Sequence, residues 1–375
     1  MKENQRFNYL DKLFQPSFRP ALRQFVESTL SSPQIIELDP TTRCNYRCPE
    51  CISANVTGQK EIPPERLKQL INEFQKAGVK AVIFIGGGEP LMHSDMPNPL
   101  IQAHSLGMEV GLTTNGSLIP RYIEAISENV SWTRVSVDAA TSETYEKFRP
   151  SGIPNSFNRV IKGMEQLAKV KKGALGYCFL IMQRPDSLDE LTNAGEIAEA
   201  ARLAKEIGCN YFEFKPMVDL RHYLIPFSQE MSQVVVEQYE IAKQLEDDNF
   251  AVVAPKSIEF LQEHPNPAQP KDYERCAVME FRTLVTPTGI YPCPYMRGRE
   301  DKRMGSIDNT SFDSFWSSPE RIQTMSKINP SRDCGFYCIR HLPNVALNHI
   351  RTMEEQGVRI LDSIRETPDL EDPFF

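Results

Sequence analysis

The chain has 375 residues and a formal net charge of −8; 25% of its residues are charged and 40% are hydrophobic. This length suffices for two modest domains, and without a basic block a nucleic-acid-binding protein is not expected. The N-terminus lacks the apolar core of a signal peptide, and the longest apolar runs are only strand-length. We therefore expect a cytoplasmic protein with neither nucleic-acid nor membrane partners.

An N-terminal leader, residues 1–33, precedes a region of regular alternation, residues 34–215. Short β-branched runs alternate there with amphipathic stretches that begin near Pro63, Pro97, Leu118, Thr141, Phe157 and Leu188. The strand-like runs are 34–39, 80–86, 108–115, 133–138, 176–182 and 210–216. This repetition predicts an α/β fold in which a parallel sheet curls into an open or closed barrel, with functional residues at the carboxyl ends of its strands. The form that we expect is a partial (β/α)6 TIM-like barrel.

The alternation of strand-like and helical segments ends after residue 215. Residues 216–275 predict a helical connection that ends in a Pro-rich loop, where we place a domain boundary. Residues 276–342 consist of short strands and turns, with a hairpin turn at Pro287–Gly289, and predict a small C-terminal α+β domain. Residues 343–375 predict a closing helix and a tail.

Seven of the nine cysteines form two groups, which in a reducing compartment indicates metal binding. The first group, Cys44, Cys48 and Cys51, directly follows the first predicted strand, and no fourth Cys or His lies nearby. Three thiolates make a poor closed zinc site but suit a cubane iron–sulfur cluster with one iron open to another ligand. A zinc knuckle completed from elsewhere in the chain is the alternative.

Three later strand ends carry further motifs: GGGEP at 86–90, TTNG at 113–116 and SVDAATSETYEKFRPSG at 136–152. Each alone is an ordinary turn or helix cap. In this order, after CxxxCxxC, they resemble the radical S-adenosylmethionine (SAM) superfamily over residues 34–215. One departure is Glu50, because the residue before the third cysteine is often aromatic in that family.

The resemblance implies a [4Fe–4S] cluster on Cys44, Cys48 and Cys51, with SAM on its open iron. One-electron reduction, from an external donor of the flavodoxin or ferredoxin type, then cleaves SAM to methionine and a 5′-deoxyadenosyl radical. The positions matched to SAM binding are Gly86, Gly87, Gly88, Glu89, Pro90, Asn115, Ser136, Asp138 and Arg149.

The second group is Cys276, Cys293, Cys334 and Cys338. Four thiols can close either a cubane cluster or a zinc site. The hairpin between Cys276 and Cys293 and the segment MGSIDNTSFDSFWSS resemble the C-terminal extension called SPASM or, in its shorter form, Twitch. Four cysteines match the shorter form, which implies one auxiliary [4Fe–4S] cluster that accepts or relays an electron; a structural zinc is the alternative.

Catalytic residues are not defined by the motifs. Cys178, on a predicted strand, is a candidate hydrogen-atom donor, although a lone cysteine there is more often a core residue. Cys209 carries the same two interpretations. Lys215, which ends the sixth strand, is a candidate charge partner or proton shuttle facing the substrate.

For the reaction, we expect an oxidoreductase- or epimerase-type enzyme. Its expected substrate is a small polar molecule, such as a sugar, aminocyclitol, nucleoside or natural-product intermediate, that is dehydrogenated or epimerised. The single auxiliary cluster resembles that of aminocyclitol dehydrogenases, and the 33-residue leader is short for a peptide-recognition domain. The alternatives are a maturase of a ribosomal peptide, oxidative modification of a tetrapyrrole or other large cofactor, and a non-enzymatic zinc-binding scaffold.

Overall fold

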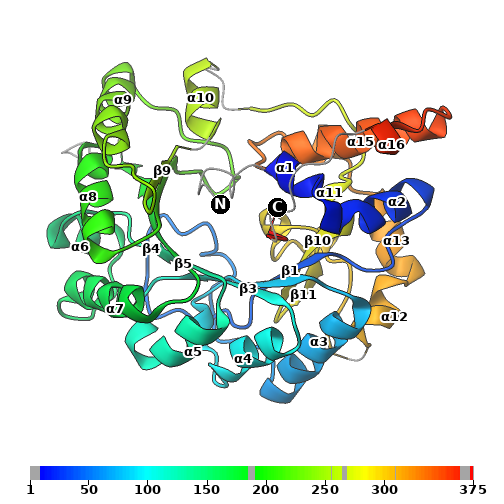
Figure 1. Ribbon diagram of the computed structural model, residues 1–375, viewed down its shortest axis with the longest axis horizontal. Helices are drawn as coiled ribbons and strands as arrows, with labels where there is room; N and C mark the ends of the chain where they lie inside the picture. The colour runs from blue at the N-terminus through cyan, green and yellow to red at the C-terminus, as the bar shows by residue number, and fades with distance from the viewer. Residues whose placement is uncertain are drawn as a thin grey trace.

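The computed structural model describes residues 9–184, 191–254, 256–263, 268–308, 310–363 and 372–374. In this part of the chain, a nine-stranded sheet curves into an open barrel with helices on its outer face (Figure 1). The strand order is β11-β10-β1-β2-β3-β4-β5-β8-β9. Neighbouring strands are parallel except for the antiparallel pair β10 and β11.

The elements have the following bounds. The strands are β1 (Ile35–Leu38), β2 (Ala81–Phe84), β3 (Glu109–Thr114), β4 (Trp132–Ser136), β5 (Ala174–Ile181), β6 (Gln183–Arg184), β7 (Leu191–Thr192), β8 (Tyr211–Pro216), β9 (Ala251–Val253), β10 (Arg282–Thr286) and β11 (Gly289–Tyr291). The helices are α1 (Tyr9–Leu13), α2 (Arg19–Glu27), α3 (Pro64–Ala77), α4 (Asn98–Ser105), α5 (Ile123–Asn129), α6 (Ser142–Phe148), α7 (Ser156–Val170), α8 (Ile197–Ile207), α9 (Gln229–Lys243), α10 (Lys256–Glu263), α11 (Val278–Phe281), α12 (Phe312–Trp316), α13 (Pro319–Ser326), α14 (Pro330–Asp333), α15 (His341–Glu355) and α16 (Ile360–Ser363).

The predicted barrel is confirmed, because the six expected strands are β1 to β5 and β8, all parallel. Along each strand, alternate side chains face opposite sides. Val135, Phe212 and Phe214 face the helices and belong to the main hydrophobic core. The residues between them, such as Arg134 and Glu213, therefore face the interior of the barrel, which we call the lumen.

One predicted helix begins later than expected. The predicted start at Leu188 lies outside the described residues, and the described helix α8 begins at Ile197. Before it, β7 pairs with β6, and the side-chain oxygen of Asn193 accepts the backbone N–H of Met182 at 2.7 Å. These hairpin contacts hold the backbone extended where the local pattern predicts a helix.

The C-terminal hairpin continues the barrel sheet. The predicted turn after residue 286 is present, but β10 pairs in parallel with β1, with Ile35 opposite Arg282. At the other edge, β9 adds an unpredicted parallel strand from the helical connection. Helices α1 and α2 lie beside α15, although they come from opposite ends of the chain (Figure 1), and Phe25 of α2 packs on Phe281 at 5.3 Å between ring centroids.

A buried carboxylate joins β1 to two later segments. Glu37 accepts hydrogen bonds from Arg282 at 2.7 Å and from Arg340 at 2.6 Å. Burial alone would raise the pKa of Glu37, but the two guanidinium groups lower it to about 2. Glu37 is therefore an anion between two cations, and it ties the first strand to the segment that holds the second cysteine group.

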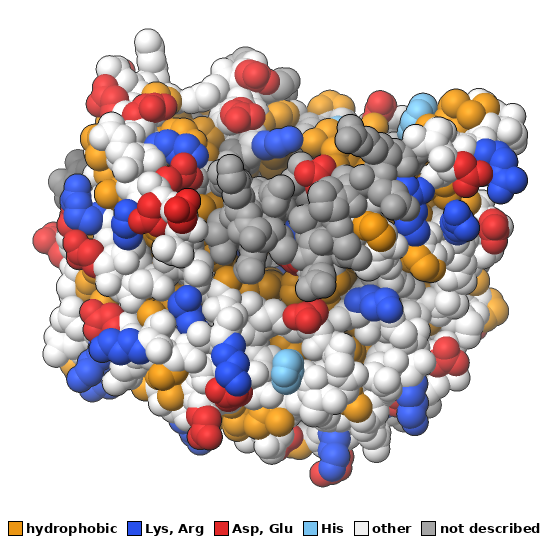
Figure 2. Space-filling view, in the orientation of Figure 1, with side chains coloured by type: hydrophobic (Ala, Val, Ile, Leu, Met, Phe, Trp, Pro, Cys, Tyr) orange, Lys and Arg blue, Asp and Glu red, His pale blue; other side chains and the backbone are white. Residues whose placement is uncertain are grey.

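Charges of both signs are interspersed on the face of the molecule seen in Figure 2. Among the described helices, none is both long and apolar enough to cross a membrane.

We predict that Glu37→Gln lowers the free energy of unfolding by about 3–5 kcal/mol, because it leaves two guanidinium groups buried without an anion. Thermal or denaturant unfolding of the reconstituted protein measures this loss. Glu109→Gln, an exposed glutamate on β3, is the matched control and should change stability by less than about 0.5 kcal/mol. Equal, small effects of the two substitutions would contradict the assignment of Glu37 as a buried anion between two cations.

Candidate active site

The first cysteine group lies on the loop after β1. Cys44, Cys48 and Cys51 are each partly exposed. Burial raises the pKa of Cys44 and raises that of Cys48 to about 11, and the neighbouring thiolates of the group add to both shifts. Thiols in such an environment ionise when a metal compensates their charge. The three predicted ligands are thus within electrostatic reach of one another at the carboxyl end of β1.

The glycines of GGGEP let this loop approach the cysteine loop. Within the turn, a Cβ atom on Gly86 would lie 1.8 Å from the carbonyl oxygen of Gly88. Against the cysteine loop, a Cβ atom on Gly88 would lie 2.2 Å from the carbonyl oxygen of Arg43. At the same contact the backbone N–H of Glu89 donates to the carbonyl of Arg43 at 2.8 Å. Gly87 is also crowded, and its carbonyl accepts from Thr57 at 3.2 Å. The motif is therefore a docking surface for the cysteine loop.

The Glu89 carboxylate connects this turn to the end of β3. One oxygen accepts from the hydroxyl of Thr114 at 2.6 Å and from the N–H of Leu91 at 3.2 Å; the other accepts from the N–H of Asn115 at 2.7 Å. Burial raises the pKa of Glu89, and these hydrogen bonds oppose that shift. The second oxygen retains capacity for another donor. Pro90 is buried and begins a short 3-10 helix.

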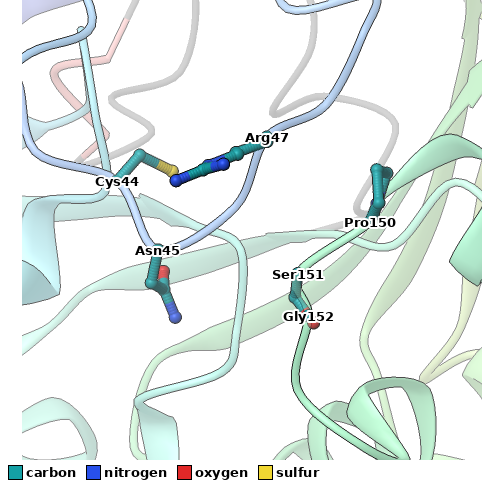
Figure 3. A pocket seen from close by; sticks show the side chains of 6 residues that line it. All are labelled: Cys44, Asn45, Arg47, Pro150, Ser151 and Gly152. Atoms are coloured by element: carbon teal, nitrogen blue, oxygen red, sulfur yellow. The ribbon is translucent and has the colours of Figure 1, made fainter.

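Asn115 also reaches the cysteine loop. Its side-chain amide donates to the side-chain oxygen of Asn45 at 2.9 Å, and the amide of Asn45 donates to the hydroxyl of Ser117 at 2.9 Å. A pocket of about 460 Å³ opens beside these contacts, within the size range of small-ligand sites. Its lining, drawn in Figure 3, consists of Cys44, Asn45, Arg47, Pro150, Ser151 and Gly152. The motifs missed Arg47, whose side chain points toward Cys44 in that view.

The end of β4 carries a buried ion pair. Asp138, whose φ is +62°, accepts from the N–H of Leu180 at 2.7 Å and pairs with Arg149. Burial lowers the pKa of Arg149, but Asp138 and Cys48 outweigh it and the net direction is upward. The Nε of Arg149 is buried without a hydrogen-bond partner among the described residues. Such an orphaned donor, next to the cysteine loop, fits an anionic group of a bound cofactor.

Glu50, the departure from the family pattern, has a partner. It forms an ion pair with Arg184 of β6, whose guanidinium lies over the ring of Phe148 at 4.9 Å and donates to the carbonyl of Lys147 at 3.2 Å. A carboxylate here holds the cysteine loop against α6 and β6, where an aromatic residue would supply packing alone.

A charged cluster faces the lumen one layer away. The strand register aligns Ser136, Cys178 and Glu213 across β4, β5 and β8. Glu213 pairs with Arg134 at 3.3 Å and lies 3.8 Å from the Nζ of Lys215. The side chains of Arg134 and Lys215 retain 26% and 32% exposure, so they border solvent inside the barrel.

The two isolated cysteines occupy different environments. Cys178 lies opposite Glu213 in the sheet, and burial raises its pKa to about 11, so it is a neutral thiol in the lumen. Burial also raises the pKa of Cys209, which packs in the main hydrophobic core. Of the two candidates, only Cys178 lies with the lumen cluster.

The four cysteines of the second group come from three segments. Cys276 precedes α11, Cys293 follows β11, and Cys334 and Cys338 flank the turn before α15. Burial raises all four pKa values, to about 11 for Cys276 and about 12 for Cys293, and thiolates of the group raise the values of Cys276, Cys293 and Cys334 further. Nowhere in the described part of the chain do three His, Cys, Asp or Glu side chains lie close enough to bind a single metal ion.

Arg297 links the second region to the first cysteine loop. Its guanidinium makes two hydrogen bonds to Asp39, at 2.6 and 3.1 Å, and one to the hydroxyl of Ser53 at 3.1 Å. Asp39 follows β1, and Ser53 lies two residues beyond Cys51. No motif indicated this contact, because the three residues are distant in sequence and none has a diagnostic local pattern.

An open parallel barrel, with three thiols in the loop after its first strand and a glycine-rich turn docked on that loop, is the arrangement expected of a barrel enzyme that binds an iron–sulfur cluster. Residues 38–194 match the model of the radical SAM superfamily, so this part of the chain is a radical SAM domain. The domain is that of a radical SAM enzyme, whose cofactors are a [4Fe–4S] cluster and SAM.

Longer alignments extend beyond that domain. An AdoMet-dependent heme synthase of Methanosarcina barkeri is 26% identical over 77% of this chain and 84% of its own. A mycofactocin maturase of Mycobacterium ulcerans is 22% identical over 84% and 83%. The SAM-bound structure of Streptococcus suis SuiB has a TM-score of 0.60 and 17% identity over 82% of this chain and 70% of its own. That alignment covers more than the part before Cys276, so the shared fold, that of SPASM/Twitch-type enzymes, includes part of the second region.

We predict that Arg297→Met destabilises the protein by about 3–5 kcal/mol, because Asp39 is left buried without its cation, and that iron on the first cysteine group is lost faster. The double variant Asp39→Asn/Arg297→Met should recover most of the stability. Unfolding and the rate of iron release to a chelator measure both effects. Arg299→Met, which removes an exposed arginine two residues away, is the control. An equal loss of stability in that variant would contradict a specific role for the contacts of Arg297 with Asp39 and Ser53, which we call the Arg297 clamp.

Proposed function

We propose that this radical SAM enzyme oxidises an organic substrate held in the lumen of the barrel. The observation that carries the proposal is that both thiol groups are joined to β1, the first by the chain itself and the second through a buried ion pair. The first group follows β1, and Glu37 within β1 binds Arg340, which lies two residues after Cys338. A second redox centre beside the first supports a reaction in which the substrate gives up an electron as well as a hydrogen atom.

When bound, SAM and the first cluster supply an alkyl radical that removes a hydrogen atom from a substrate C–H bond. The protein's own part is to orient the cofactor and to exclude water. Glu89 has an oxygen available for an ammonium group, and Arg149 has a donor available for a carboxylate. We propose that these two residues hold the amino-acid end of SAM.

Asn115, Ser136, Asp138 and the glycine-rich turn are proposed to complete the SAM site. The amide of Asn115 is already shared with Asn45, and the carboxylate of Asp138 with Arg149. We therefore propose that Asn115 and Asp138 act mainly by positioning the residues they bind, while Ser136 borders the lumen directly.

The lumen cluster indicates the charge of the substrate. Glu213 is already bound by Arg134 at 3.3 Å, and the Nζ of Lys215 lies 3.8 Å from the same carboxylate with 32% of its side chain exposed. A lysine without a short contact to a carboxylate, at a partly desolvated site, favours an anionic ligand group. We propose a substrate carboxylate as the partner of Lys215, with Cys178 as a candidate hydrogen-atom donor.

For the substrate class, a tetrapyrrole with carboxylate side chains is the first candidate, since the relative named as a heme synthase aligns over 84% of its length. A peptide is the second candidate, supported by the mycofactocin maturase and by the fold shared with SuiB, whose structure includes its precursor peptide SuiA. The small polar metabolite expected from the sequence has no support among these relatives.

The second thiol group is proposed to hold one auxiliary [4Fe–4S] cluster. The four ligands leave no position for substrate, so its role is to take up or relay the electron that the substrate loses. An external protein of the flavodoxin or ferredoxin type is the proposed partner for exchange of electrons with the enzyme.

We predict that anaerobic reconstitution yields about eight irons per chain and that dithionite with SAM then releases 5′-deoxyadenosine. Replacing Cys44, Cys48 and Cys51 by Ala should abolish this release, because no cluster then reduces SAM. Replacing Cys334 and Cys338 by Ala should spare it. Iron analysis and chromatography measure both. Four irons would contradict the auxiliary cluster, and absence of 5′-deoxyadenosine from the parent would contradict the whole proposal.

We predict that Lys215→Met raises the KM for a carboxylate substrate by about tenfold or more, because one charge-assisted hydrogen bond to the substrate is lost. The release of 5′-deoxyadenosine without substrate should stay unchanged. The probes are an iron porphyrin with carboxylate side chains and a peptide with a free C-terminal carboxylate; the readout is stimulated 5′-deoxyadenosine formation.

Lys205→Met, on the outer helix α8, is the matched control and should behave as the parent. Stimulation only by an uncharged metabolite, or an unaltered response of Lys215→Met to a stimulating carboxylate, would contradict the anionic-substrate assignment.

A further inference from the structure

A segment that precedes the second cysteine group packs against the loop 334–338. Gln269 donates its backbone N–H to the carbonyl of Gly335 at 2.7 Å, and its side-chain oxygen accepts the N–H of Cys338 at 3.0 Å. These two contacts bring the next charged side chain, Lys271, to the inner side of this loop. Because Gln269 lies two residues before Lys271, these contacts place Lys271 beside the loop that carries Cys334 and Cys338.

The ammonium group of Lys271 is buried among uncharged acceptors. The residue is 5% exposed. Its Nζ donates to the carbonyl of Phe336 at 3.0 Å and to the side-chain oxygen of Gln269 at 2.7 Å. In the described ranges it forms no ion pair with a carboxylate, and the ionisable groups whose negative charge would act on it are Cys338 and Cys334, once they are held as thiolates. A buried cation requires a compensating anion, and among the residues that the structure describes the thiol site is placed to supply it.

The other buried cations at the site have carboxylate partners. Arg340 binds Glu37 at 2.6 Å, and Lys302 binds Asp333 at 3.1 Å. Their charges are thus compensated within the protein itself. Lys271 differs from both, because its charge is available to whatever the four thiolates bind.

We propose that Lys271 is the counter-charge of the auxiliary [4Fe–4S] cluster and raises its reduction potential. The inference rests on the proposed function, in which this cluster takes up an electron. A cubane held by four thiolates is anionic, and its reduction adds one more negative charge. A buried cation nearby stabilises the reduced form more than the oxidised form, because charges interact strongly in a site with little water.

The electron balance follows from this role. After one hydrogen atom has been abstracted, the substrate is oxidised by loss of one electron, and the auxiliary cluster is reduced by that electron. An external acceptor of the flavodoxin or ferredoxin type then removes it. Lys271 favours the first transfer by making the cluster a better acceptor.

The test uses the full chain with Cys44, Cys48 and Cys51 replaced by Ala, so that the auxiliary cluster alone is titrated. After anaerobic reconstitution, a redox titration followed by electron paramagnetic resonance gives the reduction potential. Lys271→Met should make reduction about tenfold less favourable, a shift of about 59 mV to lower potential for one electron. Lys271→Arg, which keeps the charge, should restore most of the difference.

Lys171→Met is the matched control, because Lys171 also binds an uncharged oxygen, that of Asn210, but lies at the end of α7, away from the second cysteine group. It should leave the potential unchanged. Iron content and thermal unfolding establish that each variant is folded and loaded. Lys271→Gln is a second neutral variant in case the Met variant loses iron.

An unchanged potential in an iron-loaded neutral variant would overturn the role of Lys271 and leave the proposed function intact. Loss of the cluster from both neutral variants, with retention in Lys271→Arg, would support the counter-charge; loss from all three would overturn it. If the parent triple variant binds no iron, the auxiliary cluster itself is refuted, which is a separate outcome.

Discussion

The buried carboxylate of Glu37 is the contact on which the relation between the two thiol groups depends. It lies within β1, where Arg282 and Arg340, from two later segments of the chain, both bind it. Because β1 leads directly into the first cysteine loop and Arg340 follows Cys338, one anion positions both groups. Its pKa of about 2 shows that the two cations overcome the cost of burying a carboxylate.

A second buried pair, Asp39 with Arg297, repeats this arrangement two residues further along the chain. Glu37 lies on β1 and Asp39 directly after it, and the separation of two positions places both side chains on the same side of the extended chain. Both receive an arginine from beyond residue 280. The first cysteine loop is thus supported by the C-terminal region as well as by the barrel, so the conventional division into a catalytic domain and an appendage does not describe how this site is held.

The sequence was sufficient to predict the elements that depend on local patterns. The six parallel strands, the two cysteine groups and the hairpin before Cys293 each have a periodicity, a spacing or a turn that is visible within a few residues. Glu89 and Asn115 were found because they belong to motifs. Whether the motif residues bind SAM is a matter for experiment.

What could not be predicted depends on contacts between distant segments. The pairing of β10 with β1, the strand β9, the Arg297 clamp and the lumen position of Arg134 arise from sheet register, which no local pattern encodes. The late start of α8 is similar, because the contacts of Asn193 with Met182 override a helical periodicity. Lys271 carries no motif at all; only the folded chain places it by Cys338.

The pairing of β1 with β10 also has a consequence during synthesis. Between Ile35 and its partner Arg282 lies most of the chain, so a ribosome makes the whole barrel before β1 gains its second neighbour. Until then β1 presents an unpaired strand edge, which is a template for association with other chains. Fragments that stop before residue 282 would keep that edge open, and we expect them to aggregate even though they contain every SAM-binding motif.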